Sequence, residues 1–259
     1  MIYELNHFGI FVEDIDKTLD FYAKLDAKKV FHHTIEGPQV QVVYLQLAGG
    51  MIELVFNPNA PAGWKYGIDH LAFMTDDLEG DYQRLIDAGC TGDEAPKKAG
   101  TGKGTLAFLR RPDGARIELL ERDVDFRIAD SGDGIIKGFD HYAYGVDDLD
   151  EASEFFAKTM GMAHVVNIPT GGGTPTRSFY NIGYDVLGLR VAEEGSERFP
   201  HFALRVDNVD ETLAVLADRG VQPVVASAAS KSGLGRNAYL ADPDGVRIEL
   251  LDRPELSTL

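Results

Sequence analysis

The chain is poor in cysteine, in basic side chains and in long apolar runs. Its 259 residues include one cysteine, Cys90, which excludes an intrachain disulfide framework and is typical of a reducing cytoplasm. Only 25 basic residues stand against 42 acidic ones, and the net charge of -17 opposes binding to nucleic acid or to anionic membrane surfaces. No apolar run approaches the roughly 20 residues of a membrane helix, and the N-terminus does not resemble a signal peptide. We therefore expect a soluble cytoplasmic protein.

What the chain does contain is a unit that occurs four times. Four of its seven histidines open a short apolar run that ends in an acidic pair or in Asp-Asn. In three of the units a glutamate inside a second apolar run follows 46 to 48 residues later, whereas the remaining unit has Gly188 there. The residues are His7 with Glu53, His70 with Glu118, His141 without a glutamate, and His201 with Glu249. Such a repeat on strands can bring imidazole and carboxylate ligands to one metal ion.

Each unit is predicted to form a strand, a helix and then several strands. In the first unit a strand at 6–12 precedes a helix that places Ile15, Leu19 and Tyr22 on one face, with Asp14 or Asp16 as its N-cap. Strands are expected near 27–33, 40–47 and 50–56. The later opening strands are predicted at 69–75, 140–146 and 201–206, and their helices at Leu78–Ala88, Leu149–Thr159 and Val209–Arg219.

The repeat predicts two domains of two units each, which the length of the chain allows. We expect a first domain at 1–123 with modules 1–64 and 65–123, a linker at 124–137, and a second domain at 138–259 with modules 138–198 and 199–259. The glycine-rich stretch 169–175 is expected to form a loop near a pocket mouth.

The sequence leaves the pairing of the modules open. Pairing within each half would give one site from His7, Glu53, His70 and Glu118 and another from His141, His201 and Glu249. Exchange between the halves would instead join His7 and Glu53 to His201 and Glu249, and His70 and Glu118 to His141. We favour pairing within the halves because the predicted linker follows the second unit.

This pattern resembles the vicinal oxygen chelate superfamily, which includes glyoxalase I, extradiol dioxygenases and bleomycin resistance proteins. The likeness lies in the His-bearing opening strand, in a helix with Phe21-Tyr22, echoed as Phe155-Phe156, and in the Asp-Pro-Asp-Gly hairpin before the strand of Glu249. It implies an α+β fold in which four βαβββ modules pair into two domains. It also implies a divalent metal ion (Zn, Ni, Mn or Fe), a small substrate with vicinal oxygens, and compatibility with a homodimer.

The first half is most similar to glyoxalase I. The resemblance implies His7, Glu53, His70 and Glu118 as metal ligands, Glu118 as first choice for the general base, and Glu53 as the other catalytic carboxylate. It also assigns substrate contacts to Asn57 and Lys103, but Phe11 stands where glyoxalase I carries an arginine for glutathione. The implied activity is isomerisation of an α-hydroxycarbonyl or hemithioacetal through an enediolate.

The second half is more similar to an extradiol dioxygenase. His141, His201 and Glu249 match its iron ligands, Gly188 leaves a fourth position open, and Tyr239 matches a catalytic tyrosine. The histidines that would accept protons in that family are missing, since none lies between His164 and His201. Ring cleavage at an Fe(II) site is therefore the alternative to the glyoxalase-type reaction, and a bleomycin-resistance-type binding protein without catalysis is a third hypothesis.

Overall fold

The last residue of each repeated motif caps the helix that follows it. We describe a computed structural model that covers residues 1–129, 132–169, 175–193 and 195–258. In all four units the side chain of this residue accepts a hydrogen bond from a backbone amide in the first helical turn, which satisfies a donor that the helix leaves unpaired. The cap and helix pairs are Asp14 with α1 (Ile15–Lys24), Asp77 with α2 (Leu78–Asp87), Asp148 with α3 (Leu149–Glu154) and Asn208 with α4 (Val209–Asp218). Asp14, and not Asp16, is thus the first N-cap.

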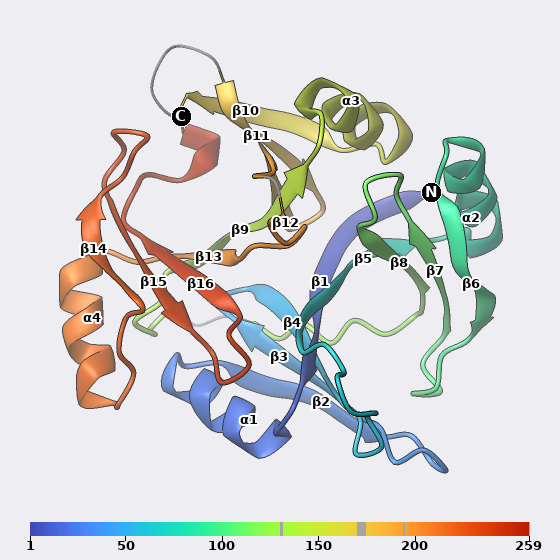
Figure 1. Cartoon of the computed structure of the whole chain (residues 1–259), viewed down its shortest axis with the longest axis horizontal. Coiled ribbons are helices and arrows are strands. Elements are labelled where there is room, and N and C mark those ends of the chain that lie inside the picture. The colour runs from blue at the N-terminus through green and yellow to red at the C-terminus, as the bar shows by residue number, and fades with distance from the viewer. Residues whose placement is uncertain (130–131, 170–174, 194, 259) are drawn as a thin grey trace.

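Sixteen strands accompany these helices in the described part of the chain (Figure 1). The first half contains β1 (Ile2–Val12), β2 (Lys28–Thr34), β3 (Gln41–Leu47), β4 (Gly50–Phe56), β5 (Gly67–Thr75), β6 (Thr91–Lys98), β7 (Thr105–Arg110) and β8 (Arg116–Glu121). The second half contains β9 (Gly138–Val146), β10 (Ala163–Pro169), β11 (Pro175–Ile182), β12 (Asp185–Val191), β13 (Phe202–Arg205), β14 (Val225–Ala229), β15 (Arg236–Ala241) and β16 (Arg247–Leu251). A π-helical turn, Phe155–Thr159, extends α3, and a 3₁₀ turn, Leu256–Thr258, follows β16.

The strands form two mixed sheets with the same topology. The first has the order β2-β3-β4-β1-β5-β8-β7-β6 and the second the order β10-β11-β12-β9-β13-β16-β15-β14. In each sheet the opening strands of two modules pair antiparallel at the centre, β1 with β5 and β9 with β13, and each pairs in parallel with the last strand of its own module. The modules therefore pair within the halves, as the sequence favoured, and the α+β fold of paired βαβββ modules is confirmed.

The two halves pack through one continuous apolar cluster. Phe8 on β1 lies edge-on against Tyr142 on β9, with 4.7 Å between the ring centroids, and both side chains are fully buried. The hairpin between β15 and β16 lies beside α1 (Figure 1), where Tyr22 Oη donates to Asp242 Oδ2 over 3.1 Å. Its counterpart between β7 and β8 meets the second half, where Tyr144 Oη donates to Asp113 Oδ2 over 2.6 Å. The hairpins thus hold the halves together reciprocally.

The stretch between β8 and β9 contains no helix or strand in its described residues, 122–129 and 132–137. It nevertheless packs against both halves. Arg127 contacts Glu4 of β1 over 3.3 Å and Asp185 of β12 over 2.5 Å, and the backbone amide of Ile128 donates to the side chain of Gln46. Most of the predicted loop at 169–175, residues 170–174, lies outside the described residues. Among the described helices, none combines the length and apolar character that crossing a bilayer requires.

Candidate metal centres

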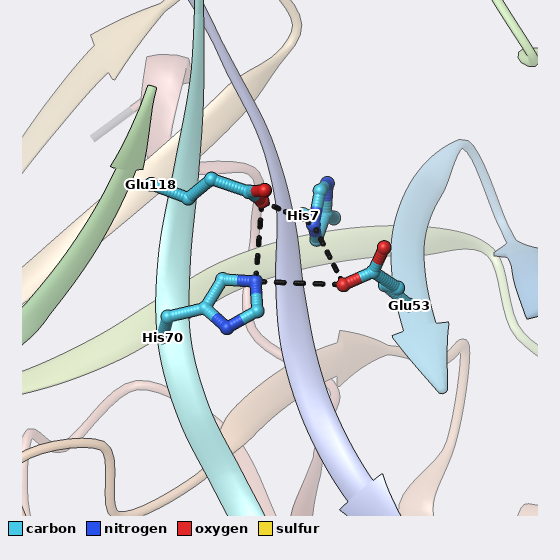
Figure 2. Close-up of side chains that lie close together, drawn as sticks. All are labelled: His7, Glu53, His70 and Glu118. Atoms are coloured by element: carbon cyan, nitrogen blue, oxygen red, sulfur yellow. Dashed lines mark ion pairs between the residues drawn. The ribbon is translucent and has the colours of Figure 1, made fainter. Parts of the chain in front are cut away.

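Four side chains of the first half point their donor atoms at one another from four strands. Nε2 of His7 lies 3.5 Å from Oε2 of Glu53 and 3.4 Å from Oε2 of Glu118. Nε2 of His70 lies 3.5 Å and 3.3 Å from the same two oxygens. Figure 2 shows the resulting ring of alternating nitrogen and oxygen atoms, and all four residues are buried. The structure thus brings together the full set that pairing within the first half predicts.

Strand register explains why these residues meet. In the parallel pair β1 and β4, Glu53 lies beside Gly9, two residues after His7, and in the parallel pair β5 and β8, Glu118 lies beside Ala72, two residues after His70. Side chains two residues apart on a strand share a face, so each histidine and its glutamate project from the same side of the sheet. The antiparallel pairing of β1 with β5 then sets the two histidine and glutamate pairs opposite each other.

Each histidine of this ring is oriented from behind by the residue that precedes it. His7 Nδ1–H donates to Asn6 Oδ1 over 2.9 Å, and Arg122 also donates to that oxygen over 2.9 Å. The amide nitrogen of Asn6 donates to Glu4, which fixes the direction of the amide group. With the Nδ1 proton engaged, the lone pair of His7 Nε2 faces the ring, as a metal ligand requires.

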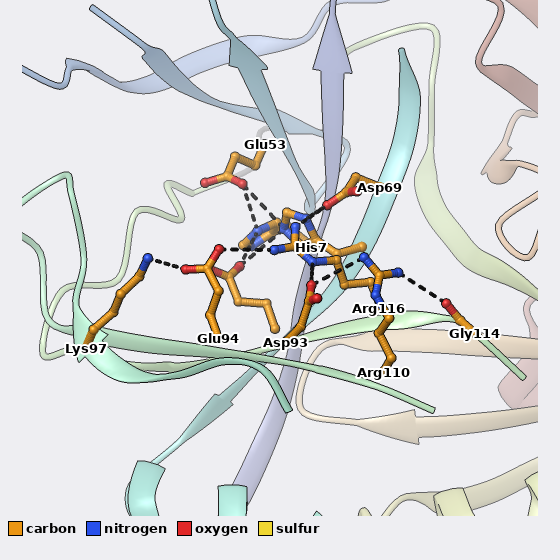
Figure 3. Close-up of polar contacts among 11 residues, drawn as sticks. His7, Glu53, Asp69, Asp93, Glu94, Lys97, Arg110, Gly114 and Arg116 are labelled. Carbon is orange, nitrogen blue, oxygen red and sulfur yellow. Dashed lines mark hydrogen bonds and ion pairs between the residues drawn. The ribbon is translucent and has the colours of Figure 1, made fainter. Parts of the chain in front are cut away.

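His70 has the same support with a carboxylate in place of the amide. Its Nδ1–H donates to Asp69 Oδ2 over 3.0 Å, and Arg116 contacts that oxygen over 2.6 Å. Figure 3 shows Arg116 lying between Asp69 and Asp93, to which it donates over 2.7 Å. Carboxylate–histidine pairs of this kind orient metal ligands in many proteins.

Unpartnered donor atoms indicate that the ring fits a cation. Nε2 of His7, Nε2 of His70 and Oε2 of Glu118 are buried and have no hydrogen-bond partner among the described residues, which is costly unless another group takes their lone pairs. Burial would raise the pKa of Glu53 and of Glu118, yet the two imidazoles lower both below the usual range. Burial would likewise lower the pKa of His70, but Asp69, Glu118 and Glu53 raise it well above its ordinary value. The ring therefore attracts positive charge, and it is a candidate site for a divalent metal ion.

A cavity of about 660 Å³ opens onto this ring, with Glu53, His70 and Glu118 in its wall. Its apolar surface comes from β1, β3, β4, β7 and β8 and from loop residues that include Ile35 and Trp64, so the sheet curls around it. Lys103 and Phe11 line this cavity, and Phe11 lies edge-on against Trp64 with 5.3 Å between the ring centroids. Asn57 does not line it, and its Oδ1 accepts a hydrogen bond from the backbone amide of Asn59.

A second cluster forms in the other half. His141, His201 and Glu249 place donor atoms within 4.8 Å of one another, so this set is also a candidate for a divalent ion. His141 Nδ1–H donates to Asp140 Oδ1 over 2.7 Å. The ring of Tyr239 lies edge-on to His201, 5.6 Å between centroids, and burial together with the charge of Glu249 raises the pKa of its hydroxyl.

The structure adds site residues that the sequence reasoning did not select. The most regular are two arginines that follow a glutamate by four positions, Arg122 after Glu118 and Arg253 after Glu249. Each donates to the residue before the first histidine of its half, Arg122 to Asn6 and Arg253 to Asp140. The signal was present in the repeated Glu-Leu-Leu-acid-Arg sequence. Tyr44 and Phe108, which also line the cavity, lie opposite Glu53 and Glu118 on the neighbouring strands, the position that Phe179 and Tyr239 hold in the second half. The cavity also includes Trp64, Lys65 and Lys97.

Comparison with known proteins places this geometry in context. The model of the Glyoxalase/Bleomycin resistance protein/Dioxygenase superfamily matches residues 4–119 and again residues 138–250. A probable chloroplastic lactoylglutathione lyase from Arabidopsis thaliana is 27% identical over 128 residues, which are 44% of this chain. That match spans only 35% of the Arabidopsis protein.

Solved structures with the same fold include members with different activities. The Mn(II)-bound glyoxalase from Novosphingobium aromaticivorans superposes with a TM-score of 0.70 and 17% identity, covering 98% of this chain and 84% of that one. The 2,3-dioxygenase LapB from Pseudomonas sp. KL28 superposes with a TM-score of 0.69 and 15% identity, covering 96% of this chain and 91% of that one. At these identities the likeness shows the fold alone.

Proposed function

The chain belongs to the Glyoxalase/Bleomycin resistance protein/Dioxygenase superfamily, and on this premise we propose that its first half is a metal-dependent isomerase or lyase of the glyoxalase type. The substrate is a small molecule with adjacent oxygens, such as a hemithioacetal. One observation carries the proposal: the donor atoms of His7, Glu53, His70 and Glu118 converge, and all but His7 line a cavity of about 660 Å³. A cavity of this size accepts a metabolite.

His7, Glu53, His70 and Glu118 would hold the ion. When bound there, a divalent cation withdraws electron density from substrate oxygens and so acidifies the neighbouring C–H bond. Glu118 and Glu53 are the bases within reach of such a proton, because both carboxylates face the cavity. The imidazoles lower the pKa of each, although burial acts in the opposite direction, so both are ionised at neutral pH and can accept a proton. Glu118 remains our first choice.

Charge in the cavity favours an anionic substrate. Although the chain carries a net charge of -17, the cavity wall bears six basic side chains and, apart from the two ring glutamates, three acidic ones. Lys65 and Lys103 have no ion-pair partner among the described residues. They are therefore available to a carboxylate on the substrate. The basic residues are Lys65, Lys97, Lys103, Arg110, Arg116 and Arg122, and the acidic ones are Asp69, Asp93 and Glu94.

The thiol of the substrate need not be glutathione. Phe11 and Trp64 form an apolar edge of the cavity where glyoxalase I carries an arginine for that peptide. A panel of thiols is therefore needed to find the best substrate.

The alternative is ring cleavage of catechols at His141, His201 and Glu249. The convergence of these three side chains, which match an iron site, favours it. The space around these side chains argues against ring cleavage, because two cavities beside the cluster measure about 10 Å³ each. A catechol and dioxygen need far more room.

A comparison of two reactions tests the proposal. Protein freed of metal with a chelator and reloaded with Ni²⁺, Zn²⁺, Mn²⁺ or Fe²⁺ is assayed with methylglyoxal and a series of thiols, and separately with catechols while oxygen uptake is followed. We expect thiol-dependent turnover that falls at least about a hundredfold in Glu53→Gln, since this substitution removes one charged donor atom. Catechol cleavage that survives Glu53→Gln would support the alternative, and no turnover of either kind would favour a binding protein.

A further inference from the structure

Two arginines stand in the second half where the first half has two valines. Arg177 on β11 lies directly opposite Arg190 on β12. The same place in the first half, two residues along β4 from Glu53, holds Val42 opposite Val55. Both valines line the cavity of about 660 Å³. The two halves therefore differ at this place by two positive charges.

The arginine pair lines a small cavity beside two histidines. This cavity measures about 10 Å³, and its wall contains Arg177, Arg190, His141 and His201 but no carboxylate side chain. Both arginines are partly buried. Side chains directly opposite each other in an antiparallel pair point to the same face of the sheet, with about 5 Å between their Cβ atoms. The two guanidinium groups thus belong to one face, next to the histidines.

The charge of this pair is not balanced within the described part of the chain. Neither Arg177 nor Arg190 forms an ion pair with a described residue, although the chain contains 42 acidic side chains. Nε of Arg190 is buried and has no hydrogen-bond partner among the described residues. Like charges directly opposite each other on neighbouring strands are destabilising, and so is a buried donor without an acceptor. An anion beside the two arginines would remove both costs.

We propose that Arg177 and Arg190 bind the carboxylate group of a small molecule, with one carboxylate oxygen in the small cavity and the rest of the ligand outside it. A guanidinium group is planar and donates two parallel hydrogen bonds to a carboxylate. Size favours a carboxylate over a phosphate, because a cavity of about 10 Å³ holds about one water molecule, and therefore one oxygen atom. The site is separate from the cavity of the first half and does not depend on the reaction proposed there.

A titration with sodium acetate tests this proposal without any substrate. Isotope-labelled full-length protein, loaded with ZnCl₂ and desalted, is titrated at constant ionic strength while NMR follows the Nε–H resonances of its arginine side chains. We expect two of these resonances to shift with one common, saturable dissociation constant. One of the two should be absent from the spectrum of Arg177→Val and the other from that of Arg190→Val, which assigns them. Valine stands at both places in the first half, so the sheet accommodates it.

The single variants also show which groups bind the anion. In Arg190→Val the remaining resonance of Arg177 should report acetate binding at least about tenfold weaker, because charge-assisted hydrogen bonds are lost. Lys24→Ala removes an exposed positive charge at the end of α1 and should leave the affinity unchanged.

Three results would overturn the proposal. The first is the absence of a saturable shift in the natural chain. The second is equal acetate affinity in Arg190→Val and the natural chain, which would place the bound acetate elsewhere, at a metal ion or in the first cavity. The third is tighter binding of inorganic phosphate than of acetate at the same two resonances, which would contradict a site for carboxylates.

Discussion

Gly9 and His70 approach each other so closely that a side chain at residue 9 would have to displace the imidazole of His70. A Cβ on Gly9 would lie 1.9 Å from Cε1 of His70 and 2.2 Å from its Nε2, the atom that faces the ring of donors. Gly9 on β1 pairs directly with His70 on β5, so the strand pairing keeps the two backbones from moving apart. The glycine is therefore part of what places His70 in the first candidate metal centre.

Gly9→Ala should displace His70 and weaken metal binding at the first site. We expect the affinity for Zn²⁺ or Ni²⁺ to fall at least about tenfold, because loss of ligand orientation typically has this effect or a larger one. Competition with a chromophoric chelator measures it. Ala143→Gly changes the equivalent position of the second half and provides the matched control, since it should leave first-site affinity unchanged. Equal affinities in Gly9→Ala and the natural chain would show that the site adapts to the methyl group.

Asp69→Asn should also weaken the first site, though the ligands themselves are intact. The amide retains an acceptor for His70 Nδ1–H but loses the charge that Arg116 also contacts. We expect metal affinity to fall by about 10-fold to 100-fold. Asp140→Asn makes the same change behind His141 and should spare first-site affinity. If both substitutions weakened the first site equally, the effect would be general destabilisation.

Lys103→Ala should raise KM for an anionic substrate while kcat stays nearly constant. The side chain lines the cavity and has no ion-pair partner among the described residues, and an unpaired cation can bind ground state and transition state alike. Loss of one charge-assisted hydrogen bond corresponds to about a tenfold rise in KM. Lys98→Ala removes an exposed lysine on β6 that does not line the cavity and should change neither constant. A fall in kcat alone would assign Lys103 a different role.

Burial of the Asp242 carboxyl group should make stability depend on pH. Burial raises the pKa of Asp242 from 3.8 to about 6, although hydrogen bonds from the amides of Val246 and Asp244 and from Tyr22 act in the opposite direction. Between these values the native state retains a proton that the unfolded chain releases. The free energy of unfolding therefore falls as the pH rises from about 4 to about 6, by up to about 3 kcal/mol from this group.

Urea unfolding across this pH range tests the assignment. Asp242→Asn cannot titrate, so its free energy of unfolding should gain on that of the natural chain as the pH rises through the window. Asp218→Asn, an exposed substitution on α4, should follow the natural chain throughout. Parallel curves for Asp242→Asn and the natural chain would mean that Asp242 titrates at its ordinary pKa.

Much of the fold could be predicted because the deciding signals are local and repeated. A capping residue stands at the same place in all four units, and a glycine in the left-handed conformation follows the helix at Gly89 and Gly220. The helix after Asp148 was harder, since its predicted end at Thr159 is a π-helical turn. No local sequence rule predicts such a turn. It depends on how Phe155 and Phe156 are buried.

The candidate metal ligands could be chosen from the sequence because four histidines and three glutamates share one spacing. The pairing of the modules could not be deduced in the same way, because β1 could have formed the same antiparallel ladder with β5 or with β13. The difference in room between the two sites was also hidden. Beside Gly188 the space is filled by Phe179 from the neighbouring strand β11, and such packing is a tertiary effect.

The hairpins at Asp113 and Asp242 each contact the opposite half. The interface between the halves therefore resembles the isologous interface of a twofold dimer, with both protomers in one chain. At this interface each half would expose apolar residues if the other half were removed. Fragments made by a break within 124–137 would therefore be expected to reassemble, and their joint stability would then rise with concentration, as in a two-subunit protein.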